Sequence, residues 1–318
     1  MTIQHFTEDE VRAALDWDEL IAAMEGALAD FSTGRVQQPL RQWLTVEAGA
    51  RYFGVMPAAA ERSMGAKLVS FYPSNAGTAT PTVTAAVLLF DPHSGAPLAV
   101  MDGATITAMR TAAVSAAVTR RLAAPNARVL ALLGCGVQAL SHLQALSRLR
   151  AFAEIRVWSP TPAHAQRFAE RHGALAMGAE AAVRGADVIV TATAAREPIL
   201  RGAWLKPGAH VNAIGAPMPS WRELDDAAMS HTLVVESRAA AQAESGDVIL
   251  SKASIYAEAG ELFAGLKTIP AGQTTIYKSV GMAIEDIATA RLVYDTARAG
   301  TRKARSEARS PGSSAGTS

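Results

Sequence analysis

A glycine-rich turn at residues 134–139, with the sequence GCGVQA, follows the apolar run Val129–Leu133 and precedes a segment rich in alanine and leucine. In this strand–turn–helix context, Gly134 permits a tight turn, Gly136 lets the backbone approach a pyrophosphate, and Ala139 lets the helix pack closely on the strand. The helix N-terminus also offers unpaired N–H groups and positive dipole to phosphates. We therefore expect a dinucleotide to be bound by Gly134, Gly136, Val137 and Gln138. The alternative is a glycine-rich turn in an α/β domain that binds no cofactor. Cys135 is expected to be a small filler residue.

The second strand of this unit is expected to end at residues 157–161, which read VWSPT and contain no carboxylate. An Asp or Glu there would bind the adenosine ribose diol of NAD. The hydroxyls of Ser159 and Thr161 could instead bind a 2′-phosphate, which a carboxylate would repel. The sequence thus favours NADP(H), and NAD(H) is the alternative if it binds without that contact.

Three cationic residues, Arg41, Lys67 and Arg110, lie in apolar or strand-like surroundings. A buried Lys or Arg is costly unless it is paired. If the three side chains converge, they form a clamp for a carboxylate, which an Arg can grip through two oxygens. For each residue alone, a structural ion pair or a solvated side chain is the alternative. Asp102 is expected to be a helix cap or structural partner rather than a catalyst.

The elements that must position these groups are of two kinds. Residues 7–33 have helical periodicity, and short extended runs follow at 41–46, 52–57, 65–71, 82–90 and 96–101. From about residue 104, helices and strands alternate, which is typical of a parallel α/β sheet. Residues 275–298 are predicted to be helical. The Ser/Gly/Arg-rich stretch 301–318 is predicted to be disordered.

The composition narrows the class of protein. The 318 residues are 49% hydrophobic and 19% charged, which suffices for a large core. A net charge of +1 argues against nucleic-acid binding. The single cysteine excludes internal disulfides and a multi-cysteine metal site, and no metal is expected. Without a signal-peptide pattern or a membrane-length apolar stretch, a soluble cytoplasmic protein is expected.

The chain resembles the ornithine cyclodeaminase/mu-crystallin family. The matching segments are 65–69 (GAKLV), 101–103 (MDG), 105–113, 134–139, 208–215, 244–247 (ESGD) and 278–286 (KSVGMAIED), in the family's order. The resemblance implies an α/β fold, in which a Rossmann-type dinucleotide-binding domain at 116–284 joins an α+β substrate and dimerisation domain formed by 1–115 and 285–300. It also implies a homodimer.

The resemblance further implies roles for individual residues. Arg41, Lys67 and Arg110 would bind the substrate carboxylate, Val280 would lie near the substrate, and Lys67 and Arg110 would be catalytic. Lys67 could supply a proton if burial and neighbouring cations lower its pKa. Besides the turn, Ser159 and Thr161, the residues expected at the cofactor are Thr82, Arg110, Thr111, Thr193, Ile214, Gly215, Ala216 and Ser279.

Two departures from the family's pattern bear on the chemistry, and the first of them points to one branch of the family. Pro217 stands where ornithine cyclodeaminases carry an Asp that receives a proton from the substrate's side-chain amine. Val83 stands where many members have a histidine. The segment 216–225 resembles the mu-crystallin and imine-reductase branch, whose members reduce ketimines such as cyclic imine-2-carboxylates with NAD(P)H.

The expected function is therefore NAD(P)H-dependent reduction of pyrroline- or piperideine-2-carboxylate. Three alternatives stay open: an ornithine cyclodeaminase with Glu223 or Asp225 replacing the missing Asp, an alanine-dehydrogenase-like enzyme, and a non-catalytic NADPH-binding protein.

Overall fold

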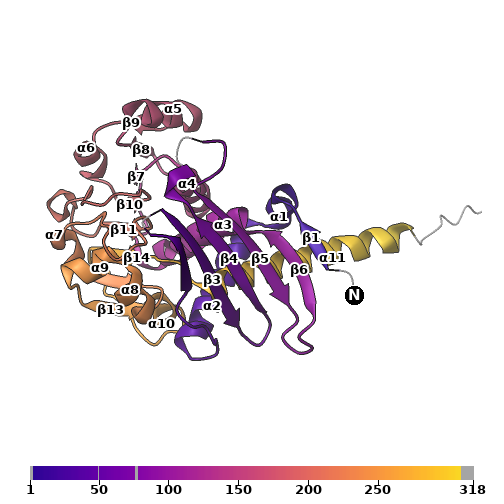
Figure 1. The fold of residues 1–318 in the computed structure, drawn as a ribbon. Helices are drawn as coiled ribbons and strands as arrows, with labels where there is room; N and C mark the ends of the chain where they lie inside the picture. The colour runs from indigo at the N-terminus through magenta and orange to yellow at the C-terminus, as the bar shows by residue number, and fades with distance from the viewer. Residues whose placement is uncertain (1–2, 49, 76–77, 309–318) are drawn as a thin grey trace, which may run out of the picture.

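Two β-sheets stand beside each other in the computed structural model, which describes residues 3–48, 50–75 and 78–308 (Figure 1). The first sheet has the order β1-β6-β5-β4-β3-β2. Its strands are β1 (Gln4–Phe6), β2 (Gln42–Glu47), β3 (Arg51–Ala59), β4 (Met64–Phe71), β5 (Val83–Phe90) and β6 (Pro97–Asp102). Only the β1–β6 pair is parallel, and β2 to β6 pair antiparallel. The mostly antiparallel sheet expected from the sequence is thus present.

The second sheet is parallel throughout, with the order β13-β12-β14-β11-β10-β7-β8-β9. Its strands are β7 (Val129–Leu133), β8 (Glu154–Trp158), β9 (Leu175–Ala176), β10 (Val188–Thr191), β11 (His210–Ala213), β12 (Thr232–Val235), β13 (Ile255–Glu258) and β14 (Thr275–Lys278). The helices between them are α4 (Val137–Leu149), α5 (Pro162–His172), α6 (Ala179–Val183), α7 (Asp226–Met229), α8 (Arg238–Glu244), α9 (Gly246–Ser251) and α10 (Ala259–Phe263). Strand order reverses between β7 and β10, and ligands of such sheets bind in the crevice at this point. This is the Rossmann-type α/β architecture expected from the sequence.

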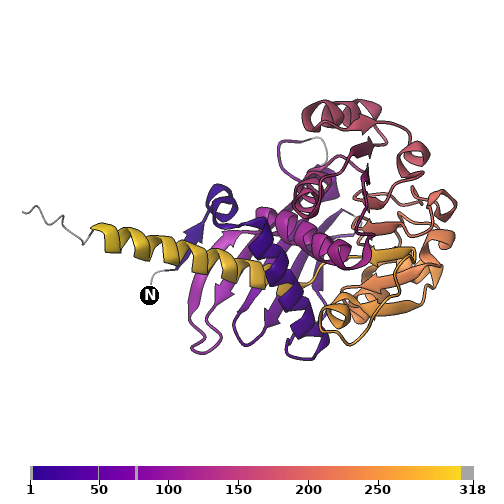
Figure 2. The ribbon, with the colours of Figure 1, turned by 180° about the vertical axis from the view of Figure 1, so that it is seen from behind.

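Helices connect the two sheets. Figure 2 shows α2 (Trp17–Ser32), α3 (Gly103–Leu122) and α11 (Ala283–Ala308) on one face of the first sheet. The short helix α1 (Glu8–Ala14) packs near them. Almost every residue of α3 from Thr105 to Thr119 is buried, because α3 contacts α2 and α11 as well as α4 of the second unit. Side chains on α3 can therefore face both sheets. In the described part of the chain, no helix has the length and apolarity needed to cross a membrane.

The structure corrects three expectations about the elements. The helix predicted over 7–33 is two helices, because Asp16 caps a new one at Trp17. The first part of the predicted helix 275–298 is β14, whose threonine, isoleucine and tyrosine suit a buried strand. Residues 301–308, expected to be disordered, continue α11 and contain good helix formers. Residues 309–318 lie outside the described residues, and the domain boundaries near 115 and 285 stay a prediction.

Two histidines lie in the core of the second unit. His142 on α4 contacts Gln138 O at 2.7 Å through Nδ1 and Ser115 Oγ at 2.9 Å through Nε2. His210 on β11 contacts Thr275 Oγ1 at 2.8 Å. Burial lowers the pKa of each ring to about 4. Both rings are therefore neutral in the folded protein at neutral pH.

We predict that mild acid destabilises the fold through these rings. An unfolded histidine titrates near pH 6.5, so the unfolded state binds more protons between about pH 6.5 and 4, and stability falls as the pH falls through that window. Lowering the pH from 7.5 to 5.5 should reduce the free energy of unfolding, measured with urea, by about 1 kcal/mol per ring. His142→Gln should flatten this pH dependence, whereas His164→Gln, at an exposed position on α5, should not. Equal pH slopes in the wild type and His142→Gln would contradict the prediction.

Candidate active site

The turn after β7 has the features that a bound pyrophosphate requires. Gly134 has φ +124°, and a Cβ there would come within 2.5 Å of Ala192 O, so only glycine fits. Gly136 caps α4 without any side-chain hydrogen bond, and a Cβ on it would meet no heavy atom within 4 Å. The first-turn N–H groups of α4 therefore face open space beside Val137, which is 70% exposed. These residues fit the phosphates of a dinucleotide.

Glu223 fixes the two loops that follow the neighbouring strands β10 and β11. Its buried carboxylate accepts hydrogen bonds from Thr191 Oγ1 at 2.7 Å, from both N and Oγ1 of Thr193 at 2.7 Å, and from Gly215 N at 2.9 Å. Burial raises the pKa of Glu223, and Lys278 opposes this shift. The predicted cofactor residues Thr193, Ile214, Gly215 and Ala216 thus lie on loops at the carboxyl ends of the strands beside β7.

The two hydroxyls at the end of β8 differ in exposure. Ser159 is buried and its Oγ accepts a hydrogen bond from Thr161 N at 3.3 Å. Thr161 is exposed at the start of α5, where His164 and Arg167 are exposed as well. Within this described segment, 157–161, no carboxylate is present, and the cationic side chain of Arg167 lies farther along α5.

Lys67 and Arg110 meet at the start of α11. Lys67 Nζ lies 2.7 Å from Asp286 Oδ2, and Arg110 Nε donates to Asp286 Oδ1 at 3.0 Å. Arg110 Nη1 also donates to Glu285 Oε2. The two cations are each 3% exposed, and they come from two different elements, Lys67 from β4 and Arg110 from α3. Asp286 thus bridges both cations.

The surroundings give the two cations different electrostatic behaviour. Burial lowers the pKa of Lys67 to about 8, Asp286 opposes the shift, and Arg110 and Arg41 reinforce it. Burial also disfavours the charge of Arg110, but Asp286 and Glu285 outweigh it and raise the pKa of Arg110. Burial, reinforced by Glu236, raises the pKa of Glu285 well above its ordinary value. The site therefore holds one permanent cation and one that titrates near neutral pH.

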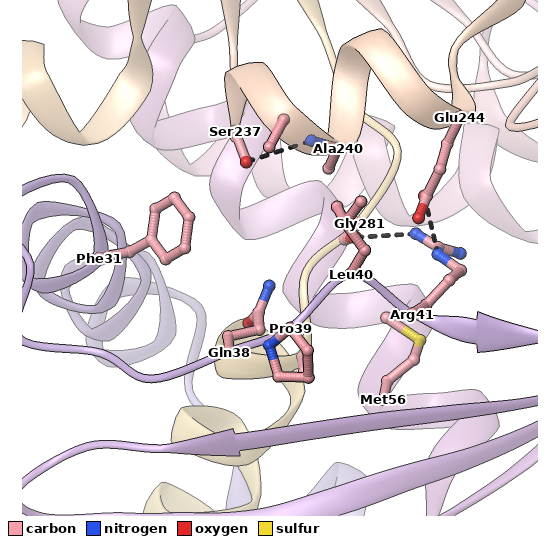
Figure 3. Close-up of a pocket in the computed structure, with 12 residues that line it drawn as sticks. Phe31, Gln38, Pro39, Leu40, Arg41, Met56, Ser237, Ala240, Glu244 and Gly281 are labelled. Atoms are coloured by element: carbon pink, nitrogen blue, oxygen red, sulfur yellow. Dashed lines mark hydrogen bonds and ion pairs between the residues drawn. The ribbon is translucent and has the colours of Figure 1, made fainter.

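Arg41 lies at the edge of this group. Its Nε is 2.8 Å from Glu244 Oε2, and its Nη2 donates to Val280 O and, at 2.8 Å, to Gly281 O. Figure 3 shows the Arg41–Glu244 pair on the wall of a small pocket that Phe31 and other residues line. Arg41 therefore reaches the turn after β14 rather than Asp286, the carboxylate that pairs with Lys67.

Hydrogen bonds to the buried carboxylate of Glu236 stabilise the turn after β14. The Glu236 carboxylate accepts hydrogen bonds from Ser279 Oγ at 2.5 Å, Val280 N at 3.0 Å and Gly281 N at 2.7 Å. Gly281 has φ +82°, and a Cβ there would come within 2.7 Å of Arg110 Nη2. The turn therefore lies directly against the guanidinium of Arg110.

The three predicted cations lie near one another, and each pairs with a carboxylate. Arg41, Lys67 and Arg110 lie in one electrostatic group, as a shared clamp requires. Each of them is also paired with an internal carboxylate, which was the structural alternative for each. Their contact with a substrate stays a prediction.

Four carboxylates of the site were not predicted from the sequence: Glu236, Glu244, Glu285 and Asp286. A signal for three of them was available, because buried cations need counter-charges and these acids stand in the matching segments 244–247 and 278–286. Asp102 is a helix cap, as expected, since it accepts a hydrogen bond from Thr105 N at 2.7 Å.

Thr82 and Thr111, the remaining predicted cofactor residues, are held by local contacts. Thr82 is half-buried just before β5 and its carbonyl accepts a hydrogen bond from Tyr72 N at 2.8 Å. Thr111 is buried next to Arg110 and its hydroxyl donates to Thr107 O at 2.7 Å.

Comparison with known proteins agrees with this geometry. Residues 4–301 match the ornithine cyclodeaminase/mu-crystallin family. Ketimine reductase mu-crystallin from Mus musculus is 50% identical over 286 residues, which cover 87% of this chain and 91% of the mouse protein. The structure of Thermococcus litoralis Δ1-pyrroline-2-carboxylate reductase in complex with NADH and L-proline has a TM-score of 0.89 at 33% identity, covering 94% of this chain and 98% of that one. An archaeal alanine dehydrogenase dimer with bound NAD has a TM-score of 0.88 at 33% identity, covering 95% and 98%.

Proposed function

This chain belongs to the ornithine cyclodeaminase/mu-crystallin family, and we propose that it reduces small cyclic imine carboxylates with a reduced nicotinamide dinucleotide. It is an oxidoreductase that acts on C=N bonds, and the proposed substrates are pyrroline-2-carboxylate and piperideine-2-carboxylate. The observation that carries the proposal is the buried pair of Lys67 and Arg110, of which one cation titrates and the other is permanent.

The proposed mechanism divides the work between these residues. The turn before α4 would hold the phosphates of a reduced nicotinamide dinucleotide, and that cofactor would supply the hydride for the imine carbon. Arg110 keeps its charge and attracts the substrate carboxylate, which orients the ring. Lys67 gives a proton to the imine nitrogen, which makes the neighbouring carbon electrophilic. The C=N bond becomes CH–NH, and Lys67 regains its proton from water.

The loop 216–225 disfavours ornithine cyclodeaminase activity. That reaction needs an acidic group for the substrate's side-chain amine, and Pro217 cannot provide one. Glu223 is fully buried and binds the loops after β10 and β11. Asp225 accepts hydrogen bonds from Gly202 N at 2.9 Å and Ala228 N at 2.8 Å, so it caps α7. Neither acid is free to replace the missing Asp.

One set of assays separates the remaining candidates. We expect the purified protein to oxidise NADPH when it is given pyrroline-2-carboxylate or piperideine-2-carboxylate. Proline and ammonia formed from L-ornithine, without imine reduction, would establish a cyclodeaminase instead. Amination of pyruvate that requires ammonia would establish an alanine-dehydrogenase-like enzyme. Binding of NADPH without any turnover would indicate a storage protein.

The preference for NADP(H) over NAD(H) is part of this proposal, and the exposed Thr161 at the start of α5 supports it. Similar proteins carry NADH or NAD in their structures, so the preference needs its own test. Ser159→Asp would place a carboxylate at the end of β8, where it repels a 2′-phosphate and can bind a ribose diol.

We predict that Ser159→Asp lowers kcat/KM for NADPH by about tenfold or more, which corresponds to about 1.4 kcal/mol, and changes kcat/KM for NADH little. The measurement is steady-state imine reduction with each dinucleotide. Ser159→Ala is the matched control, because it removes the hydroxyl without adding charge. A wild-type enzyme that already prefers NADH, or a variant whose preference does not move, would refute the NADP(H) assignment.

The exposed strand β2 supports a homodimer. Leu44 is 65% exposed and Val46 is 53% exposed on this edge strand, which is an apolar surface that a second copy could cover. Light scattering of the purified protein tests this, with Leu44→Glu expected to weaken the association.

A cytoplasmic location stays a prediction from the sequence.

A further inference from the structure

Asp286 lies between the two buried cations of the site, Lys67 and Arg110. Its side chain is fully buried in the first turn of α11. One carboxylate oxygen lies 2.7 Å from Lys67 Nζ, and the other accepts a hydrogen bond from Arg110 Nε at 3.0 Å. A single acid therefore contacts both cations.

The side chains around Lys67 come from α3, α11, the strands β3 and β5, and the segment just before β2. From α3 come the charge of Arg110 and the hydroxyl of Thr107, whose Oγ1 lies 3.5 Å from Nζ. Arg41, just before β2, adds another positive charge. The strand neighbours of Lys67 are Met56 on β3 and Val87 on β5, which are apolar. Among the described residues, Asp286 is the only carboxylate paired with Lys67.

The two cations depend on Asp286 to different degrees. Arg110 has a second partner, because its Nη1 donates to Glu285. Lys67 has no second ion pair among the residues described, and two cations repel its charge. Loss of the Asp286 charge therefore leaves Arg110 paired, whereas Lys67 remains buried between positive neighbours without compensation.

We propose that Asp286 is a positioning residue for the reduction: it keeps the Lys67 ammonium protonated and directs it, while Arg110 is held independently by Glu285. This inference rests on the proposed function, in which Lys67 protonates the imine. Asp286 itself does not touch the substrate. It determines the pH range over which the proton donor is charged.

The test is the pH profile of Asp286→Asn. Removing an adjacent opposite charge lowers the pKa of a lysine by about 1–3 units. A shift of about two units from the present value would reduce the ammonium fraction at pH 7 by about tenfold. We expect kcat at pH 7 to fall by about that factor and to recover toward the wild-type value near pH 5.5, with KM changing little because Arg110 remains. The ratio of variant to wild-type rates cancels the titration of the substrate.

Two further variants separate positioning from folding. Asp286→Glu keeps the charge and should restore most of the wild-type pH profile. Asp295→Asn removes a charge from an exposed part of the same helix, where it pairs with Arg291, and should leave the profile unchanged. A loss of activity in Asp286→Asn that is equal at all pH values, or a profile of Asp286→Glu that matches that of Asp286→Asn, would overturn the proposal.

A readout without turnover distinguishes failure of this proposal from failure of the proposed function. In protein labelled with ¹³C-lysine, the Cε resonance of Lys67 is assigned from its absence in Lys67→Met and followed with pH. We expect its midpoint in Asp286→Asn to lie at least about one unit below that of the wild type. If the wild type reduces no imine, the proposed function fails, yet the titration still tests the link between the two residues. An unshifted midpoint would overturn the positioning role even in an active enzyme.

Discussion

Lys67→Met is expected to lower imine reduction at pH 7 by about 10²- to 10⁴-fold, which is the range that general acids contribute to catalysis. Lys67 is 3% exposed, and methionine has a similar length without the charge. Asp286 keeps Arg110 as a partner, so the fold should survive. NADPH affinity should be nearly unchanged, because the glycine turn lies on the second sheet.

The measurement is kcat and KM for pyrroline-2-carboxylate, together with a fluorescence titration of NADPH. Lys267→Met is the matched control, since the Lys267 ammonium donates to the carbonyl of Tyr256 and lies over the ring of that residue, away from the site. Activity within about fivefold of the wild type would remove Lys67 from the mechanism, because that corresponds to only about 1 kcal/mol of barrier. Loss of NADPH binding would instead indicate a wider structural change.

The features that the sequence predicted best are contiguous in the chain. The strand Val129–Leu133, the turn that follows it and the helix after the turn occur where expected, because glycine spacing and apolar runs are local signals. The strand β14 was missed because its four residues, TIYK, are too few to distinguish a strand from the start of a helix. Its assignment depends on β11 and β12, which flank it in the sheet.

The ion pairs of the site illustrate what a single sequence cannot supply. Arg110 and Asp286 are 176 residues apart, and only the packing of α3 against α11 brings them together. The sequence showed that buried cations need partners, but it did not identify them among many acids. A shared clamp for a substrate carboxylate therefore stays a prediction, and the carboxylates that pair with the three cations came only from the structure.

Removal of Arg110 should have the largest effect on stability. Its guanidinium pairs with Asp286 and Glu285, both buried, and Glu236 also contributes to the negative potential around it. Arg110→Met leaves Asp286 paired with Lys67 and leaves Glu285 without an ion pair among the described residues. Breaking a buried ion pair in this way costs about 3–5 kcal/mol, because an uncompensated charge stays in the interior. Urea unfolding at pH 7.5 measures the loss.

A matched pair and a double variant show whether charge is the cause. Arg291→Met breaks a half-exposed pair with Asp295 on α11 and should cost at most about 1 kcal/mol. Glu285→Gln combined with Arg110→Met should recover part of the loss, since the double variant removes the unpaired acid together with its partner. Burial already raises the pKa of Glu285, so lowering the pH protonates this unpaired acid and removes its charge. The free energy of unfolding of Arg110→Met should therefore fall less on acidification than that of the wild type. If Arg110→Met costs no more than Arg291→Met, the buried network does not hold α11 in place, and Arg110 must be retained for contact with the substrate alone.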